Sequence, residues 1–364
     1  ARTDASSSSS SHFWKSLFTS NVIRAPSAPP PRRMLYTPDR KNAQSTFKVL
    51  CYNVLAATYA TGYMYPYCPL WALHWGYRSK RVLQEIMRYR ADIICLQEVQ
   101  VNHYKDFFLP KLSQQGFDGV FKRKTRESSR SDIDVVDGCA IFFHRSRFAL
   151  REKHTVEYNS LAEMHIGDPS ILRRLMKGNI GLIVILEELG SHGHHQRRSR
   201  QICVANTHIY WDPGYRDVKL WQTFMLLHQL NTHLQHRNLP LIITGDFNSE
   251  VDSAVYDFLA NHSVKADHPI MKDPNTLKLM QYMQHIEHHI PIKSAYSTFE
   301  EPKFTNYTGH YTGTLDYIWY THHLLKTLGV LEMPDEPQLK AYTALPSPQH
   351  PSDHLPLLSE FAFL

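Results

Sequence analysis

Short apolar runs that each end in polar residues recur along this chain from residue 46 onward. Asn53 closes one such run, Gln97 and Glu98 close the next, and Asp246 closes a later one. Apolar runs of about four to eight residues predict β-strands that are covered on both faces. A strand end is also where a rigid element delivers a side chain to solvent, so several ends can build one preorganised crevice. We therefore expect a β-rich core with a polar site at one edge.

Helical periodicity separates some of these runs. Two helices are predicted from apolar residues at helical spacing, one over residues 77–90 and one that Asp217 would cap. Strands are predicted at residues 47–52, 92–96, 139–143, 180–186, 202–206, 239–244, 315–320 and 354–363. So many strands with few helices between some of them favour two packed sheets flanked by helices, without an internal repeat.

Residues 1–44 differ from the rest of the chain. A serine run at residues 6–11 and prolines at residues 29–31 leave no sustained apolar period, so the segment cannot bury enough surface to offset its ordering entropy. We predict a flexible tail over residues 1–44 and one folded domain over residues 45–364. A serine- and arginine-rich start that is poor in acids also fits an organelle transit peptide, which stays an alternative.

Composition and charge exclude several classes of protein. No apolar stretch approaches the roughly 18 to 20 residues that span a bilayer, so we expect a soluble protein that does not enter a membrane. The five cysteines form no CxxC pair, which is typical of buried thiols in a reducing compartment. Residues 1–44 carry five of the six net positive charges, so bulk charge gives the domain little support for a nucleic-acid partner.

Two further segments carry predictions of their own. The basic run at residues 122–124 is either a solvated loop or a surface that steers a polyanion. Residues 187–201 contain closely spaced glycine and histidine and are predicted to form a surface loop.

Glu98 is the strongest candidate for a metal ligand. Mg²⁺ prefers carboxylate and amide oxygens and needs only one or two protein carboxylates when a substrate phosphate completes its shell. Asn53 offers an amide oxygen for the same site. The sequence contains no HExxH, zinc-finger spacing, Walker A loop or G-x-S-x-G motif, which argues against zinc protease, P-loop and common serine hydrolase chemistry.

A second acid lies inside a strand-like run near the C-terminal third of the chain. Asp316 sits between apolar residues, where an unpaired charge is costly, and Asp353-His354 precedes the last predicted strand. Asp316 could therefore hold the His354 ring in one tautomer and favour its protonated form. The alternative is a turn aspartate and a satisfied core aspartate, and the two residues alone do not decide between these interpretations.

The order of these residues resembles the endonuclease/exonuclease/phosphatase superfamily. The resemblance covers roughly residues 46–364 and rests on one polar set in this order: Asn53, Gln97-Glu98, His208, Asp246, Asn248, Asp316 and Ser352-Asp353-His354. It implies a four-layer αββα sandwich of two mixed sheets flanked by helices, and hydrolysis of phosphoesters with Mg²⁺.

Longer motifs resemble one branch of that superfamily, the poly(A)-specific deadenylases of the carbon catabolite repressor family. The matching stretches are Tyr67-Cys68-Pro69-Leu70-Trp71, Phe107-Phe108-Leu109-Pro110, Val136-Asp137-Gly138-Cys139, Trp211-Asp212-Pro213 and Gly313-Thr314-Leu315-Asp316. This resemblance implies a 3′→5′ exoribonuclease that shortens poly(A) tails and releases 5′-AMP. A small-phosphoester hydrolase of the same superfamily, such as an NADP(H) 2′-phosphatase, and an inactive RNA-binding scaffold remain alternatives.

The resemblance also implies a role for each site residue. Glu98, with Asn53 and Asp353, would hold Mg²⁺, as a site for two ions. Asp246 would orient or deprotonate the attacking water, and Asn248 would hold the scissile phosphate. His208 and His354 would stabilise the transition state, with Asp316 orienting His354. Pro213 and Tyr311 would sandwich an adenine, although the family usually has Phe at the position of Tyr311.

The family further suggests partners and a location. Its members are subunits of the Not complex, and fungal and animal members dock through leucine-rich repeats, of which this sequence shows no period. Poly(A) RNA is the expected partner. Association with other Not-type subunits is expected only if it occurs through a different element or through an N-terminal segment missing from this sequence. We expect the cytoplasm as the location, with the nucleus or an organelle as alternatives.

Overall fold

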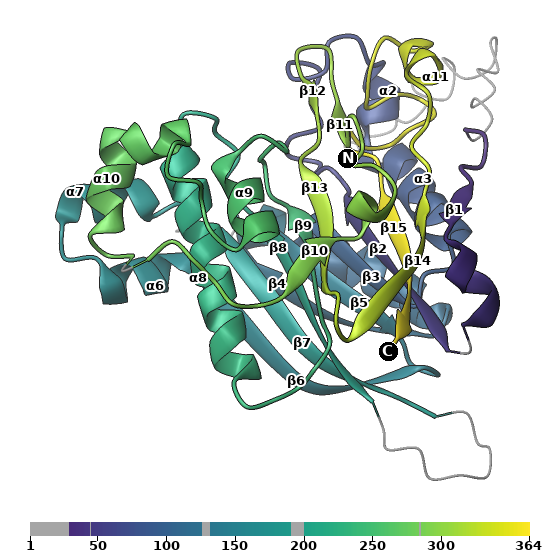
Figure 1. Cartoon of the computed structure of the whole chain (residues 1–364). Helices are drawn as coiled ribbons and strands as arrows, with labels where there is room; N and C mark the ends of the chain where they lie inside the picture. The colour runs from purple at the N-terminus through teal and green to yellow at the C-terminus, as the bar shows by residue number, and fades with distance from the viewer. Residues whose placement is uncertain (1–28, 44, 126–131, 191–199, 284) are drawn as a thin grey trace, which may run out of the picture.

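Two β-sheets packed face to face form the centre of the molecule (Figure 1). The structure is a computed structural model that describes residues 29–43, 45–125, 132–190, 200–283 and 285–364. The first sheet has the strand order β1 (Met34–Tyr36), β14 (Leu325–Leu331), β15 (Leu357–Phe363), β2 (Thr46–Asn53), β3 (Ile93–Gln100), β5 (Asp137–His144) and β4 (Phe117–Arg123). The second has the order β10 (Ile292–Ser294), β13 (Asp316–Thr321), β9 (Leu241–Asp246), β8 (Gln201–His208), β7 (Ile180–Glu188) and β6 (Phe148–Glu157).

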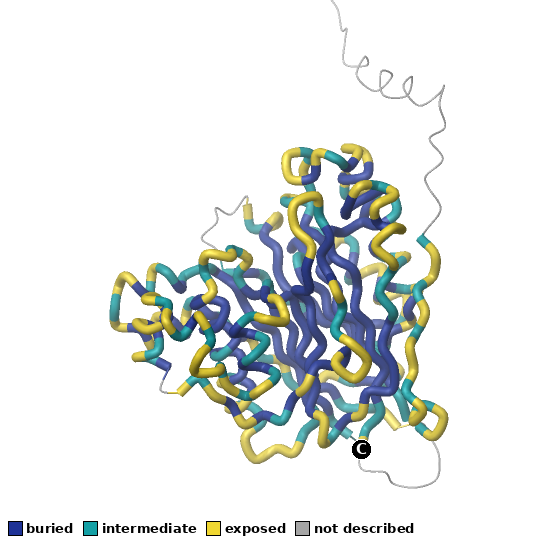
Figure 2. Tube along the Cα trace, turned by 45° about the horizontal axis from the view of Figure 1, so that its top comes forward, coloured by how far each residue is buried: buried dark blue, intermediate teal, exposed yellow. Residues whose placement is uncertain are grey.

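Apolar residues on both faces of the central strands explain this layering. In β2, Val49 and Cys51 pack into the core between the sheets, whereas Leu50 and Tyr52 pack beneath helix α3 (Trp75–Arg88). Alternate side chains of a strand point to opposite faces, so a continuous apolar run is buried from both sides. Figure 2 shows the result, with buried strands in the middle and exposed loops around them.

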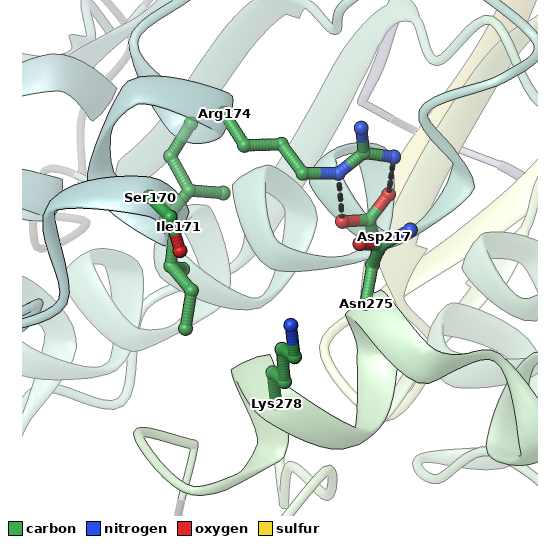
Figure 3. Close-up of a pocket in the computed structure, with 7 residues that line it drawn as sticks. Ser170, Ile171, Arg174, Asp217, Asn275 and Lys278 are labelled. Carbon is green, nitrogen blue, oxygen red and sulfur yellow. Dashed lines mark hydrogen bonds and ion pairs between the residues drawn. The ribbon is translucent and has the colours of Figure 1, made fainter.

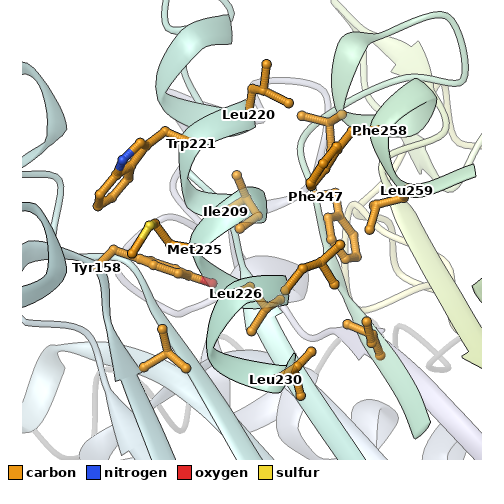
Figure 4. Close-up of a cluster of buried hydrophobic side chains, with 14 of the residues drawn as sticks. Tyr158, Ile209, Leu220, Trp221, Met225, Leu226, Leu230, Phe247, Phe258 and Leu259 are labelled. Atoms are coloured by element: carbon orange, nitrogen blue, oxygen red, sulfur yellow. The ribbon is translucent and has the colours of Figure 1, made fainter. Parts of the chain in front are cut away.

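Helices cover the outer face of each sheet. On the first sheet these are α3, α4 (Val101–His103), the π-helical turn η2 (Tyr104–Phe108) and α5 (Leu109–Gln114). On the second they are α6 (Tyr158–His165), α7 (Pro169–Leu175), α8 (Arg216–Leu234), α9 (Ala254–Asn261) and α10 (Pro274–Met280). Figure 4 shows Leu226 and Leu230 of α8 packed toward the sheet. The predicted four-layer αββα sandwich is confirmed.

One end of the sandwich carries small elements that complete the fold. These are α2 (Leu70–Leu73), α11 (Glu336–Lys340) and the hairpin of β11 (Asn306–Tyr307) and β12 (Thr312–Gly313), at the top of Figure 1. Four single turns of 3-10 helix lie elsewhere in the described residues: η1 (Pro38–Asn42), η3 (Ile133–Val135), η4 (Pro269–Lys272) and η5 (Tyr296–Thr298).

The structure corrects the predicted boundary of the flexible tail. Residues 29–43 belong with the domain in the structure, because Met34–Tyr36 pairs antiparallel with β14 and Arg40 forms an ion pair of 2.7 Å with the buried Glu360. Backbone pairing at a free sheet edge holds this segment in place without any apolar period of its own. Residues 1–28 lie outside the described residues, so for them the tail stays a prediction.

The predicted cap of α8 is also wrong. The helix begins at Arg216, after Tyr215, and Asp217 accepts two hydrogen bonds from Arg174 instead, at 2.7 and 2.8 Å. Seven strands in the described part of the chain, β1, β4, β6, β10, β11, β12 and β14, were not predicted, because none of them contains a continuous apolar run of the expected length. The predicted loop at residues 187–201 falls largely on residues 191–199, which lie outside the described residues.

Other predictions from composition can be compared with the structure. All five cysteines are buried free thiols. In the part of the chain that the structure describes, no helix is long and apolar enough to cross a bilayer.

Arg78 ties the loop after β2 to the segment before β15. Its guanidinium is fully buried and donates to the backbone carbonyls of Leu73, Val54, Leu55 and Pro351 at 2.9 to 3.1 Å. These carbonyls belong to three separate stretches of chain, so one side chain fixes their spacing. Burial lowers the pKa of Arg78, and the negative charges of Asp353 and Glu98 oppose that shift.

Replacing Arg78 by Leu should destabilise the whole fold. Four buried carbonyls would lose their donor, and we expect the free energy of unfolding to fall by about 4 kcal/mol. Chemical denaturation followed by circular dichroism measures this loss. Lys80→Leu, which removes an exposed cation from the same helix, serves as the control and should change stability by less than about 0.5 kcal/mol. Equal stability of the two variants would contradict this structural role.

Candidate active site

The polar residues that close the central strands meet at one end of the sandwich. β2 runs parallel to β3, and β8 runs parallel to β9, so each pair ends at the same edge of its sheet. β13 begins at that edge, with Asp316 opposite Asp246. β15 runs antiparallel to β2, so His354, just before it, lies there too. The structure therefore brings the predicted residues together, while their roles stay predictions.

Asn53 joins the two sheets at this end. Its side-chain Nδ2 donates to Glu98 Oε1 at 3.1 Å and to Asp246 Oδ2 at 3.0 Å. Its Oδ1 accepts the backbone N–H of Leu55 at 3.1 Å, and a carbonyl oxygen of this kind keeps a second lone pair. Because Asn53 is fully buried, it holds the two carboxylates at a fixed separation.

Glu98 reaches the site through an irregularity in β3. The register with β5 shifts between Leu96 and Val99, and Glu98 has a φ of 58°. A bulge re-aims a side chain that would otherwise alternate with its neighbours, and positive φ in a non-glycine residue stores strain that marks functional sites. Glu98 Oε2 also accepts the backbone N–H of Ala56 at 2.8 Å. Burial and the charges of Asp137 and Asp353 raise the pKa of Glu98 to about 7.

Asp246 lies at the centre of the site. Its Oδ2 is 3.6 Å from His354 Nε2 and 3.7 Å from His208 Nε2, and its Oδ1 accepts the backbone N–H of Asn248 at 2.9 Å. Burial raises the pKa of Asp246 to about 6, with Asp316 adding to the shift and His354 opposing it. A carboxylate with a pKa in this range can accept a proton near neutral pH.

Asp316 and His354 form a buried hydrogen-bonded pair. His354 Nδ1 donates to Asp316 Oδ2 at 2.7 Å, and the Thr305 hydroxyl donates to the same oxygen at 2.6 Å. Burial alone would lower the pKa of His354, but the charges of Asp316, Asp246 and Asp353 outweigh it and raise the pKa well above the usual value. These charges favour the protonated ring, whose Nε2 lies 3.6 Å from Asp246 Oδ2.

Asp353 has hydrogen-bond partners that differ from those of Asp246 and Asp316. Its Oδ2 accepts the Tyr65 hydroxyl at 2.8 Å and Asn306 Nδ2 at 3.2 Å. The preceding Ser352 donates to the backbone carbonyl of Asn53 at 2.7 Å. These contacts bind the segment before β15 to the end of β2 and place a second carboxylate near Glu98, as its effect on the pKa of Glu98 shows.

Asn248 is held from two sides. It has a φ of 47°, its Nδ2 donates to the carbonyl of Ile209 at 2.9 Å, and its own carbonyl accepts Lys219 Nζ at 2.7 Å. Lys219, from the first turns of α8, is buried, and burial lowers its pKa to about 8 although Asp246 and Asp212 oppose the shift.

Pro213 and Tyr311 lie on exposed segments at the rim. Tyr311 is 37% exposed, and Pro213 sits in the loop between β8 and α8. Arg174 Nη2 donates to the Gly214 carbonyl at 3.1 Å and so holds this loop. Figure 3 shows Arg174 paired with Asp217 beside a cavity of about 240 Å³, whose lining includes none of the predicted site residues.

Comparison with known proteins places the fold and this site in a family. Residues 50–354, which include Asn53, Glu98, Asp246 and His354, match the model of the Endonuclease/Exonuclease/phosphatase family. The chain belongs to this family. The four-layer fold of this endonuclease/exonuclease/phosphatase domain therefore has a common origin with that of its relatives.

Individual relatives refine the comparison. The chain is 42% identical to "Carbon catabolite repressor protein 4 homolog 1" of Arabidopsis thaliana over 95% of its own length. It is 40% identical to "CCR4-Not complex 3'-5'-exoribonuclease subunit Ccr4" of Mycosarcoma maydis over 87% of its length. It spans 64% of the plant relative and 50% of the fungal one. The resemblance to the carbon catabolite repressor family is confirmed.

Solved structures of the endonuclease/exonuclease/phosphatase family agree. The structure of ANGEL2, described as a 2',3'-cyclic phosphatase in complex with adenosine-2',3'-vanadate, matches with a TM-score of 0.74 at 28% identity, covering 92% of this chain and 99% of that one. The human Nocturnin catalytic domain with bound sulfate matches with a TM-score of 0.64, also at 28% identity, covering 93% of this chain and 100% of that one.

The donor set of this endonuclease/exonuclease/phosphatase domain fits a hard divalent cation. Glu98, Asp353 and Asn53 offer only oxygen atoms, which Mg²⁺ prefers. The raised pKa of Glu98 shows that its negative charge is under-compensated in the folded chain, and a bound cation would supply the missing compensation. Asp246, Asp316 and His354 also place ligand atoms within 4.8 Å of one another, but the hydrogen bond from His354 Nδ1 to Asp316 makes them an acid–imidazole–acid chain.

Several site residues were not predicted from the sequence. Tyr65, Asn306, Thr305 and Lys219 all contact predicted residues. The first three are common residue types in loops, so the sequence does not mark them. Only Lys219, a cation among the apolar residues of α8, stands out in the sequence.

The structure corrects the predicted setting of the basic run at residues 122–124. Lys124 is buried and pairs with Asp137 at 2.7 Å, beside Glu98, and Lys122 pairs with Glu157. The run spans the last two residues of β4 and the residue after it rather than a solvated loop, and each of the two lysines forms an ion pair with an acid of the domain.

Proposed function

We propose that this chain is a Mg²⁺-dependent 3′→5′ exoribonuclease that shortens poly(A) tails and releases 5′-AMP. The observation that supports this proposal is a continuous series of contacts. It runs from Glu98 through Asn53 to Asp246, and from Asp246 to His354 and Asp316. It occurs in a chain that is 40% identical to a protein named as a 3'-5'-exoribonuclease subunit.

The carboxylate side of the site is proposed to hold the metal. Glu98, with Asp353 and Asn53, would bind Mg²⁺, as two ions when substrate phosphate completes the shell. When bound, the metal supplies polarisation of the phosphoryl oxygens and a lowered pKa for the attacking water. Asn53, which already donates to both Glu98 and Asp246, would keep metal ligand and proton acceptor in register.

The remaining residues are proposed to act on the reacting phosphate. Asp246, with its raised pKa, would orient the water and accept its proton. Asn248 would hold the scissile phosphate from a backbone fixed by Lys219. His354, protonated and aligned by Asp316, and His208 would donate to the charge that develops on the phosphoryl oxygens in the transition state.

Selection of the base is assigned to two exposed residues at the edge of the site. Pro213 and Tyr311 would sandwich the adenine at the 3′ end, where stacking contributes about 1 to 3 kcal/mol per base. Stacking needs only a ring face, so tyrosine can replace phenylalanine. The half-exposed Tyr311 offers such a face.

Replacing Tyr311 by Ala should impair poly(A) cleavage by about 5- to 160-fold, the rate equivalent of the stacking energy. Poly(U), which stacks less strongly, should lose less. Degradation ladders of both RNAs measure the ratio. Tyr36→Ala, which removes a comparably exposed ring (46%) from β1, is the control and should leave both rates unchanged. Equal losses on poly(A) and poly(U) would argue against adenine stacking.

Other phosphoester substrates form the second candidate function. The similarity to ANGEL2 favours a 2',3'-cyclic phosphate end as substrate, and an NADP(H) 2′-phosphatase is a further possibility within the fold. An inactive RNA-binding scaffold would keep binding without cleavage.

One assay separates these functions. Purified protein is offered 5′-labelled RNA with a 3′ adenosine tail, poly(U), RNA with a 2′,3′-cyclic phosphate end, and NADPH, each with Mg²⁺ or EDTA. A Mg²⁺-dependent ladder on the adenosine tail is the expected result. Hydrolysis of the cyclic end or phosphate release from NADPH, without a ladder, would replace the proposed function.

Partners and location are proposed from the relatives. The fungal relative is named as a CCR4-Not complex subunit, so we propose association with other Not-type subunits. We propose the cytoplasm as the site of action, with the nucleus as a second location.

A further inference from the structure

We propose that Glu250 is a positioning residue that holds the Tyr311 ring in place for the terminal base. The proposal rests on the function proposed above and extends it to a residue outside the predicted site. Glu250 follows the Asp246–Asn248 segment, on the loop between β9 and α9.

A direct contact joins the two side chains. The Tyr311 hydroxyl donates to Glu250 Oε1 at 2.9 Å. The tyrosine side chain folds back over Gly313: a Cβ added there would lie 2.3 Å from the tyrosine hydroxyl oxygen and 3.2 Å from Glu250 Cδ. Residue 313 must therefore lack a side chain for this contact to form.

Both backbones that carry the contact are fixed. The Tyr317 hydroxyl donates to the Ser249 carbonyl at 2.9 Å, and Ser253 N–H donates to the Glu250 carbonyl at 3.0 Å. On the other side, Tyr311 N–H donates to Thr308 Oγ1 at 3.1 Å, and its carbonyl accepts Thr308 N–H at 2.8 Å. A tyrosine has two side-chain torsions, so anchoring its hydroxyl to a fixed carboxylate sets the plane of the ring.

The position of the ring makes this anchor relevant to substrate. The hairpin that carries Tyr311 adjoins the site, because Asn306 pairs with Gly313 and its Nδ2 donates to Asp353 Oδ2 at 3.2 Å. Burial and the hydrogen bond to Glu250 raise the pKa of Tyr311, and the charges of Asp246 and Asp316 add to the shift, so the hydroxyl stays a donor. An exposed carboxylate here repels the phosphates of RNA. Glu250 therefore lowers the entropy cost of ordering the ring while adding an electrostatic cost, and the two effects can be separated by mutation.

A double-mutant cycle on oligo(A) cleavage tests the proposal. Glu250→Ala and Tyr311→Phe should each raise KM about threefold to tenfold and leave kcat within about twofold, because a pre-ordered ring contributes to ground-state and transition-state binding alike. The double variant should be no worse than Tyr311→Phe alone. Glu250→Gln, whose amide oxygen still accepts, should restore most of the wild-type KM. Asp252→Ala removes an exposed charge from the same loop and should lower KM or leave it unchanged.

Two results would overturn the positioning role. One is additive effects of the two substitutions, which would mean that Glu250 acts independently of the hydroxyl. The other is a Glu250→Ala variant that behaves like Asp252→Ala, which would leave charge repulsion as its only effect.

Failure of the proposed function has a different signature, since the wild-type protein would then not shorten oligo(A) at all. Fluorescence polarisation with labelled oligo(A) in EDTA tests the contact in that case. The dissociation constants should follow the same order as the KM values, and equal constants for all variants would refute the proposal.

Discussion

Glu98→Gln should reduce poly(A) cleavage at least about a thousandfold while leaving the fold intact. The substitution keeps the size of the side chain and can keep the bond from Ala56 N–H, but it removes the charge proposed to hold Mg²⁺. Burial and the charges of Asp137 and Asp353 raise the pKa of Glu98 to about 7, so its ionised form is disfavoured in the folded chain. In EDTA at pH 8 the variant should therefore unfold at the same temperature as the wild type or higher.

Magnesium gives a second measurement that does not depend on turnover. Mg²⁺ should raise the unfolding temperature of the wild-type protein, because a ligand of the native state stabilises it, and this shift should be lost in Glu98→Gln. Glu163→Gln, in an exposed position of α6, is the matched control and should keep both activity and the Mg²⁺ shift. Retained cleavage in Glu98→Gln, or an undiminished Mg²⁺ shift, would refute the ligand role.

Asp316→Asn should lower kcat by about three orders of magnitude and alter its pH dependence. Burial lowers the pKa of His354, and the charge of Asp316 is the largest of the effects that raise it. Without that charge the pKa falls, so the protonated ring is lost at lower pH. The alkaline limb of the kcat profile should therefore move to lower pH, as single-turnover rates between pH 6 and 9 would show. An asparagine amide can also donate to Nδ1 and select the wrong tautomer.

The control for this pair is a charge removed elsewhere. Asp118→Asn, whose side chain is largely exposed and 3.5 Å from Arg145, should leave kcat and its pH profile unchanged. An Asp316→Asn variant with near-normal kcat would show that His354 needs no orienting acid. A large loss with an unmoved alkaline limb would contradict a protonated His354 as the titrating group.

Much of the site could be read from the chain because its residues sit at strand ends. Asn53, Glu98, His208 and Asp246 follow apolar runs. In a core made of two sheets, such runs form buried β-strands. The family motifs then fixed their order and predicted the layers. What strand periodicity could not show is the bulge at Glu98, since one extra residue in a ladder leaves no mark on composition.

The contacts that were missed come from long-range pairs between ordinary residues. Tyr65 meets Asp353 across 288 positions, and Arg78 meets Pro351 across 273. The two corrected predictions have the same cause. The sequence suggests that Lys124 is a solvated cation, but in the structure it pairs with Asp137. The sequence suggests that Asp217 is a helix cap, but in the structure it accepts a hydrogen bond from Arg174. Local sequence carries no information on which distant partner satisfies a buried charge.

The amino-acid sequence alone determined the apolar central strands, the family and the residue types that a phosphoester-cleaving site needs, because hydrophobic periodicity and motif order are local properties. Only the tertiary structure decided how those groups are arranged: that Asn53 bridges Glu98 and Asp246, that His354 lies between Asp316 and Asp246, and that the Tyr311 hydroxyl donates to Glu250. Hydrogen bonds and charge interactions depend on distances of a few ångströms between side chains, and those distances are set by packing of the two sheets, not by the spacing of residues along the chain.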